Sequence, residues 1–220
     1  QPGATETARG GGEWRSGGSL AVYYMRDNSY QQIDDTATNT TTTEADTNLN
    51  QILTTFDAFT AYSGGDLRVK LRATGAYTSD FRVDGADEAA LSALFIEVFD
   101  APQRYYLRVG RQTRSTGGVL GRFDGGLAWY RFSPVFKLEA VAGAPVESTR
   151  DINIASSRVF YGVSLVFGRF AGAWDGDIYV IEQRASGVVD RRAVGLELRY
   201  VSTSRAIFGA IDYDTHFGRL

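Results

Sequence analysis

The sequence contains no cysteine, and only one histidine, one methionine and four prolines among its 220 residues. Without cysteine there is no disulfide framework, no thiolate metal site and no cysteine nucleophile. A single histidine, His216, rules out any site that needs two imidazoles. The formal net charge of -3 gives no electrostatic case for nucleic-acid binding. Apolar runs fall far short of the roughly 20 residues that a transmembrane helix requires.

What the sequence does contain is glycine, aromatic residues and an alternation of apolar and polar residues. It has 25 glycines, 12 tyrosines and 13 phenylalanines. The alternation is clearest over 67–74, where apolar residues take the odd positions and polar or cationic residues the even ones. Segments 135–140 and 191–200 repeat this pattern. A period of two indicates a β-strand with one apolar face, so the sequence predicts an all-β protein without a substantial helix.

Eleven strands are predicted, and the links between them alternate in length. The strands are expected over 18–27, 49–62, 66–80, 90–100, 104–113, 121–132, 135–144, 158–168, 172–184, 188–201 and 204–215. Short links are expected at 63–65, 101–103, 133–134, 169–171 and 202–203. Longer links are expected near 28–48, 81–89, 114–120 and 145–157, and the brief link at 185–187 falls on the same side. The longest link contains the threonine-rich run 37–44, which lacks apolar residues and is expected to be mobile.

Short turns on one side and long loops on the other are typical of a transmembrane β-barrel. A soluble β-sandwich is the alternative, because its strands alternate in the same way. Consecutive strands joined by hairpins, full charges on the polar faces and aromatic residues at strand ends favour the barrel. Those aromatic residues are expected to form girdles at the membrane surfaces: Tyr23, Tyr24, Tyr62, Tyr77, Phe99, Tyr105, Tyr106, Tyr130, Phe132, Phe167, Tyr200 and Tyr213. The prediction is an antiparallel, up-and-down transmembrane β-barrel over 18–220.

The predicted strand number is odd, whereas bacterial single-chain barrels usually have an even number. We therefore expect an incomplete piece of a larger barrel, with about 11 strands visible and the C-terminal strands missing. A miscounted strand is the alternative explanation. The glycine-rich segment 1–17 is predicted to be a flexible periplasmic linker, with a periplasmic domain expected upstream of it.

Strand parity predicts which charged residues line the pore. They are Arg68, Lys70, Arg72, Glu97, Arg108, Lys137, Glu139, Asp175, Asp177, Arg191, Glu197, Arg199, Asp212 and Asp214. Arg68, Lys70 and Arg72 form a column of three cations on one strand face, which lipid would not tolerate. One interpretation is a charged constriction that selects solutes by its field and hydrogen bonds. The other is that cross-strand ion pairs fill a narrow lumen and hold it rigid, and both interpretations stay open.

The search for catalytic and metal-binding residues predicts neither. His216 follows Asp212 and Asp214 at even spacing, yet no nucleophile can be identified near it, so a solvated histidine is the preferred interpretation. Asp175 and Asp177 lack the dense oxygen-ligand loop of a calcium site. We expect no enzymatic activity, no cofactor and no metal ion.

Several short motifs between about 105 and 215 carry a resemblance to a known family. The strand end 109–112 (VGRQ) and the re-entry 117–125 (GGVLGRFDG) resemble outer-membrane porins of the alginate-type polysaccharide-export kind. The pieces 143–146 (GAPV), 190–200 (DRRAVGLELRY) and 212–214 (DYD) are similar to barrel domains that follow periplasmic tetratricopeptide repeats, although this chain contains no helical repeat. Within the motif, Arg111 and Arg122 are placed to pair with Asp124 at the rim of the barrel.

The resemblance implies an outer-membrane pore of a Gram-negative bacterium that passes a solute or a polysaccharide without chemistry. Its long loops are expected to be extracellular and its short turns periplasmic. The expected partners are outer-membrane lipid and a polysaccharide or small anionic solute, with no nucleic acid. Two alternatives remain: a non-conducting membrane anchor or loop-presenting barrel, and a soluble β-sandwich that acts as a binding module.

Overall fold

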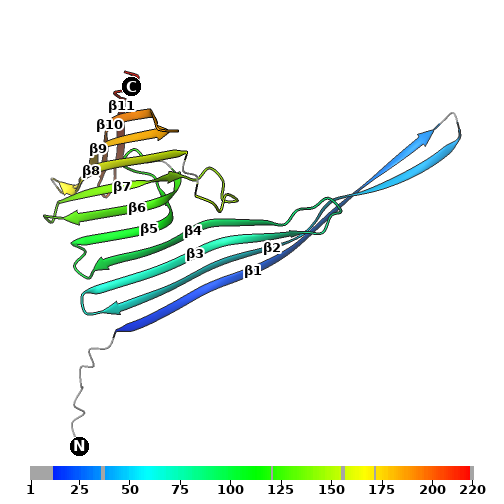
Figure 1. Ribbon diagram of the computed structural model, residues 1–220, viewed down its shortest axis with the longest axis horizontal. Coiled ribbons are helices and arrows are strands. Elements are labelled where there is room, and N and C mark those ends of the chain that lie inside the picture. The colour runs from blue at the N-terminus through cyan, green and yellow to red at the C-terminus, as the bar shows by residue number, and fades with distance from the viewer. Residues whose placement is uncertain (1–11, 36–37, 120, 155–156, 171, 219–220) are drawn as a thin grey trace, which may run out of the picture.

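The chain forms one antiparallel sheet in which every strand pairs with its neighbours in sequence (Figure 1). The computed structural model describes residues 12–35, 38–119, 121–154, 157–170 and 172–218. Within this part of the chain the strands are β1 (Glu13–Asp35), β2 (Thr40–Gly64), β3 (Leu67–Asp80), β4 (Glu88–Asp100), β5 (Tyr105–Arg114), β6 (Gly121–Arg131), β7 (Phe136–Pro145), β8 (Arg158–Phe170), β9 (Trp174–Ala185), β10 (Val188–Val201) and β11 (Ala206–Asp214). The all-β, antiparallel and up-and-down predictions are confirmed, and β1 and β11 are the two edges of an open sheet.

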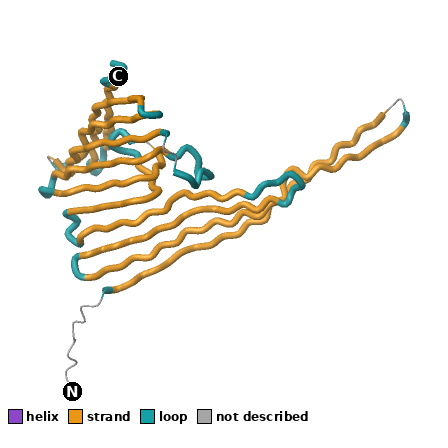
Figure 2. The backbone as a smooth tube through the Cα atoms, viewed as in Figure 1, coloured by secondary structure: helices purple, strands orange, loops and turns teal. Residues whose placement is uncertain are grey.

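The sheet curls from β5 to β11, whereas β1 to β4 run out beyond the curled part, and β1 and β2 are the longest strands (Figure 2). Short hairpin turns join the strands at one end, at Gly65–Asp66 among other places. At the other end the links after β3, β5 and β7 are longer, whereas only Ser186 and Gly187 join β9 to β10. In the described part of the chain, no helix has the length and apolar character needed to cross a membrane.

The first hairpin differs most from expectation. The predicted loop over 28–48 is wrong, because β1 and β2 continue through it as a two-stranded ribbon that includes Thr40 to Thr43. Threonine is β-branched and suits an extended strand, and the paired backbone groups satisfy one another without burial of apolar surface. The N-terminal prediction also changes, since β1 begins at Glu13, inside the segment 1–17 predicted as a linker. Residues 1–11 of that linker lie outside the described residues.

The register converts the two-residue period into two distinct faces of the sheet, because directly paired residues point to the same side. Lys70 lies opposite Glu97, which lies opposite Arg108. A second row crosses nine strands through Arg68, Phe99, Tyr106, Trp129, Glu139, Ser164, Tyr179, Gly195 and Asp212. We call the face that carries these rows the inner face and the opposite one the outer face.

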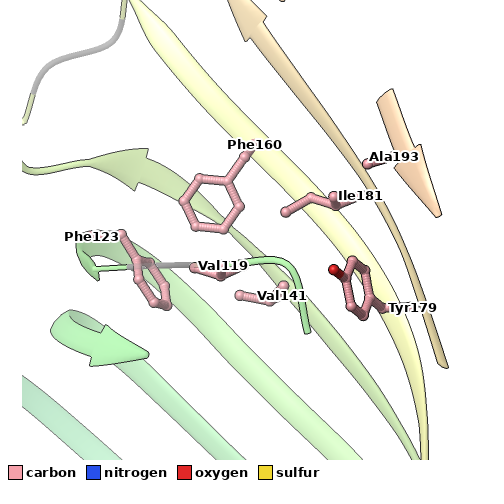
Figure 3. Close-up of a cluster of buried hydrophobic side chains, with 7 residues drawn as sticks. All are labelled: Val119, Phe123, Val141, Phe160, Tyr179, Ile181 and Ala193. Atoms are coloured by element: carbon pink, nitrogen blue, oxygen red, sulfur yellow. The ribbon is translucent and has the colours of Figure 1, made fainter. Parts of the chain in front are cut away.

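A hydrophobic cluster is buried on the inner face of β6 to β10 (Figure 3). Its members are Val119, Phe123, Val141, Phe160, Tyr179, Ile181 and Ala193. Phe123 and Phe160 meet edge to face, with ring centroids 5.2 Å apart. Val119 comes from the β5–β6 loop, so this loop folds inward and covers apolar residues that would otherwise face the hollow of the sheet. Inward folding of the loop therefore depends on hydrophobic burial.

Removal of a cluster ring should be costly. We expect Phe123→Ala to lower the free energy of unfolding by about 3–5 kcal/mol, because it deletes a side chain that is only 1% exposed and leaves a cavity. Phe81→Ala is the matched control, since that ring is 54% exposed. Its effect should stay within about 0.5 kcal/mol. Equilibrium denaturant unfolding measures both, and equal effects would contradict the role of the cluster.

Candidate functional site

The inner face is the candidate site, because the register brings all fourteen predicted pore-lining residues to it. Seven of the fourteen form ion pairs between neighbouring strands. The pairs are Arg72 with Asp57 (2.7 Å), Arg108 with Glu97, Arg191 with Asp212 (2.5 Å) and Arg199 with Asp175 (2.7 Å). Lys137 lies 3.3 Å from Glu139 on the same strand. The wall of the hollow is thus a network of alternating charges held by the hydrogen-bonded register.

The cationic column of β3 is not uniform. Arg72 donates through Nη2 to Asp57 Oδ2 on β2 at 2.7 Å, and Thr74 donates to the same oxygen at 2.7 Å. Arg68 donates to the carbonyl oxygens of Gly65 and Leu67 at the hairpin turn. The Lys70 side chain forms neither a hydrogen bond nor an ion pair with any other described residue. Of the three cations, Lys70 is therefore the one without a direct side-chain contact, and we call it unengaged in this sense.

Two partners in this network were missed by the sequence analysis. Asp57 is the only charged residue of the predicted strand 49–62, and that isolation was the signal that could have found it. Arg114 was assigned to the loop 114–120, but it is the last residue of β5, where it pairs with Glu139. Arg114 Nε also donates to the Thr116 carbonyl at 2.7 Å, so it holds the start of the inward-folding loop.

Arg191 holds the other half of this loop. Its Nη1 donates to the Gly118 carbonyl at 3.2 Å, and its Nη2 to Asp212 Oδ2. The Tyr179 hydroxyl donates to the same carboxylate oxygen at 2.6 Å. The β5–β6 loop is consequently fixed by two arginines as well as by the burial of Val119. It narrows the hollow on the side of β9 and β10.

The rim motif lies on the outer face, where β4 and β5 separate. Arg111 forms a two-bond pair with Asp124 (2.8 and 2.7 Å) and also donates to the Leu91 carbonyl at 3.3 Å. Arg122 donates to the Ser92 carbonyl at 3.0 Å. Pairing of Arg122 with Asp124 was predicted, but among the described contacts Arg122 instead satisfies β4 backbone, because β4 pairs with β5 only over Leu94–Phe99. The two arginines join strands where the ladder has ended.

The outer face of β9 and β10 carries an apolar band between two boundaries. At one boundary Trp174 and Tyr200 lie with ring centroids 5.1 Å apart. At the other, Arg192 contacts Glu182 at 2.6 Å. The side chains between them are exposed or half-buried and apolar: Ile178, Val180, Val194, Leu196 and Leu198. From residue 174 to residue 182 is eight steps, or about 26 Å along the strand.

Aromatic residues continue the first boundary along the turn end of the sheet. Tyr105 lies directly opposite Tyr130, and both rings are about half exposed on the outer face. Phe99 and Tyr106, also predicted to belong to a girdle, are instead on the inner face. The Tyr106 ring stacks on Trp129 at 5.3 Å, and its hydroxyl donates to Glu97 at 3.1 Å. These two aromatic residues belong to the wall of the hollow.

Among the described residues, neither a catalytic histidine nor a metal centre is assembled. The backbone N–H of His216 donates to Asp214 at 2.8 Å, and its ring packs on Phe217, while Asp212 is engaged by Tyr179 and Arg191. In this part of the chain, groups of three or more His, Asp or Glu side chains that could hold a metal ion do not occur. The inner face therefore offers charge and hydrogen bonds as its chemistry.

The link between β3 and β4 is organised by one carboxylate. Asp87 accepts hydrogen bonds from the Tyr77 hydroxyl (2.7 Å), the Ser79 hydroxyl (3.2 Å) and the Asp80 backbone N–H (3.1 Å). The Tyr77 hydrogen bond makes the largest contribution to holding the pKa of Asp87 below its ordinary value. The ionised carboxylate is thus part of the loop structure at neutral pH.

Comparison with known proteins gives a distant structural likeness. No protein-family model matches the chain, and no curated protein sequence matches it. Among solved structures, Pseudomonas aeruginosa OccK2 (OpdF) in complex with glucuronate is similar, with a TM-score of 0.39, 12% identity, and coverage of 90% of this chain and 64% of that chain. A second structure of OccK2 (OpdF) gives a TM-score of 0.39, 13% identity and coverage of 93% of this chain and 67% of that chain. The chain spans 64% of the length of the first structure, so the activity of a whole channel is a proposal for it.

The rim motif predicts that Arg111 and Asp124 contribute jointly to the free energy of unfolding. Arg111→Met should lower the free energy of unfolding by about 3–5 kcal/mol, because it leaves the Asp124 carboxylate without its partner in a site where both side chains are at least nine-tenths buried. Arg111→Met combined with Asp124→Leu should cost less than the sum of the two single changes, with a coupling energy of about 2 kcal/mol. Denaturant unfolding of the unchanged chain, the two single variants and the double variant completes this double-mutant cycle. Additive effects would show that the Arg111–Asp124 pair does not contribute to the free energy of unfolding.

Proposed function

We propose that this chain forms part of an outer-membrane channel that conducts solutes past a charged wall. The observation that carries the proposal is the separation of the two faces of one curled sheet. The outer face of β9 and β10 is apolar between an aromatic and a charged boundary. The inner face carries the fourteen charged residues and their partners. A lipid-facing apolar surface opposite a polar interior is the arrangement of a transmembrane β-barrel.

The dimensions of the outer band support this environment. Its length of about 26 Å along the strand corresponds, at a strand tilt of about 40°, to about 20 Å along the membrane normal, which is within about 5 Å of the apolar band of such barrels. The exposed rings of Tyr105, Tyr130 and Trp174 lie at the end where interfacial aromatic residues belong. The ribbon of β1 and β2 extends past the opposite boundary and would project from the membrane (Figure 1).

The inner face suggests the chemical class of the cargo. Arginine forks and the unengaged Lys70 favour solutes rich in carboxylate or hydroxyl groups. A polysaccharide is the finer form of this proposal, supported by the motif resemblance over residues 105–215. A small anionic solute would use the same groups.

A non-conducting barrel is the second candidate, and one observation favours it. The β5–β6 loop is packed onto the inner face by Val119 and fixed by Arg191, so part of the hollow is filled. A closed lumen would leave the extended β1–β2 ribbon as the functional part of the molecule. Conductance separates this candidate from the channel.

The channel proposal is tested by single-channel recording of the purified full-length protein, which contains this chain, in a planar bilayer. We expect discrete conductance steps whose ion selectivity depends on the charge at position 70. Lys70→Gln should lower the anion-over-cation permeability ratio by about twofold at 0.1 M salt, because it removes the unengaged cation of β3. The change should be much smaller at 1 M salt, where the Debye length falls from about 10 Å to about 3 Å.

Arg150→Gln is the control for this measurement, since it removes the same charge from an exposed loop position that pairs with Glu88. Its selectivity should match that of the unchanged chain. Absence of conductance in a folded, inserted chain would overturn the channel and leave the non-conducting candidate. A conducting Lys70→Gln chain with unchanged selectivity would show that the field at β3 is set by other residues.

Orientation is tested with single cysteines, which is straightforward because the natural sequence has none. Thr42→Cys, in the projecting ribbon, should react with a membrane-impermeant maleimide on intact cells. Ser202→Cys, in the short turn between β10 and β11, should react only after the outer membrane is permeabilised, because short barrel turns face the periplasm. The opposite labelling pattern would mean that the insertion is reversed.

A further inference from the structure

Two carboxylates on the inner face form neither a hydrogen bond nor a salt bridge with a cation among the described residues. Asp177 on β9 lies directly opposite Glu197 on β10, on the same side of the sheet. Asp177 is 5% exposed, and its Oδ2 atom is buried without a hydrogen-bond partner. Glu197 likewise forms neither a hydrogen bond nor an ion pair with any other described residue. Like charges directly opposite each other destabilise a sheet, so this pair calls for a compensating group.

The neighbouring cations are already engaged elsewhere. Glu139 receives both Arg114 and Lys137, so one carboxylate takes two cations. Arg191 is paired with Asp212, and Arg199 with Asp175. Arg114 and Lys137 are near enough to attract Asp177, but their direct contacts go to Glu139, so Asp177 and Glu197 are the carboxylates of this part of the wall without an ion pair of their own. A buried acceptor without a donor costs about 1–3 kcal/mol, and more when it is charged.

A cavity of about 740 Å³ lies against this pair. Its lining includes both carboxylates, residues of the β5–β6 loop, the apolar residues Phe208 and Ala210, and the two arginines Arg191 and Arg199, which are paired with Asp212 and Asp175. Gly117 of that loop has a φ of +64°, and a Cβ there would lie 3.3 Å from Asp177 Oδ2. The loop can pass this close to the carboxylate because it has glycine at this position. The cavity therefore joins a buried acceptor to an apolar wall.

We propose that Asp177 and Glu197 bind the primary ammonium group of a solute in this cavity. An ammonium group brings one positive charge and three N–H donors, which match the two unpartnered carboxylates. A metal ion fits less well, because groups of three or more ligands are not found among the described residues. The Phe208 side accepts the hydrocarbon part of the solute. The inference rests on the proposed channel only for the route by which the solute arrives.

Equilibrium binding of butylammonium to the purified full chain in detergent tests the site without requiring conduction. Isothermal calorimetry should give a dissociation constant of about 1 mM, a range open to a ligand with few non-hydrogen atoms. Asp177→Asn and Glu197→Gln should each weaken binding by about tenfold or more, because each removes a hydrogen bond to a charged group. Butan-1-ol, which has the same chain length without the charge, should not bind detectably.

Asp190→Asn is the matched control, since it removes the same charge from an exposed position of β10 that does not line the cavity. Its affinity for butylammonium should equal that of the unchanged chain. Equal affinity in all four proteins, no binding to the unchanged chain, or equal binding of butan-1-ol would each overturn the site. If Asp177→Asn fails to fold, Glu197→Gln decides, because Glu197 is only half-buried.

The result is independent of the conductance experiment. A chain that binds butylammonium through these carboxylates without conducting ions would support the site and overturn the proposed channel. A chain that conducts but does not bind butylammonium would support the channel and overturn the site.

Discussion

The hydrogen-bonded register of the eleven strands is the constraint on which the other features of the molecule depend. Each strand alternates its side chains, and the register aligns these alternations from β3 to β11, interrupted by shifts at Thr74/Gly75, Phe167/Phe170 and Val189/Arg191. A slip of one residue at any pair would place charged residues among apolar ones. The same alignment sets Lys70 beside Glu97 and Asp177 beside Glu197. Both the engaged and the unengaged charges are therefore products of register.

Where the pairing of two strands ends, charged side chains provide hydrogen bonds that the neighbouring backbone no longer provides. Between β4 and β5 the ladder stops at Leu94 and Arg111, and the sheet divides into the extended β1–β4 part and the curled β5–β11 part. Arg111 and Arg122 then donate to β4 carbonyls, while the Leu91 N–H donates to the Thr149 carbonyl at 2.8 Å. Buried backbone groups must find partners, and here a salt-bridged arginine and a long loop provide them. The charged residues at this rim therefore stabilise the fold.

Local alternation was enough to predict the all-β fold, the strand order and the parity of the charged residues. It failed over the threonine run at 40–43, because a strand in a two-stranded ribbon needs no apolar face and so leaves no alternating signal. It also could not show that Val119 would pack against Phe123 and Phe160, since that contact depends on how the curled sheet closes around the loop. Arg122 was misassigned for a similar reason: its acceptor, the Ser92 carbonyl, is thirty residues away. The face on which a side chain lies follows from its position along its own strand. Its contacts at the rim and in the hollow depend on residues that are distant in sequence.

The distribution of engaged and free charges links the stability of the wall to what it could bind. Arginines with carboxylate partners hold adjacent strands together, and their charge is largely neutralised within the protein. Of the fourteen predicted pore-lining residues, those whose side chains form neither a hydrogen bond nor an ion pair with another described residue are the ones available to a solute. They are Lys70 on β3, and Asp177 and Glu197 on β9 and β10. The β5–β6 loop, held by Arg114 and Arg191, narrows the hollow beside those carboxylates. Hydrophobic burial of Val119 thus brings loop backbone to the one place on the described inner face where two adjacent carboxylates lack partners.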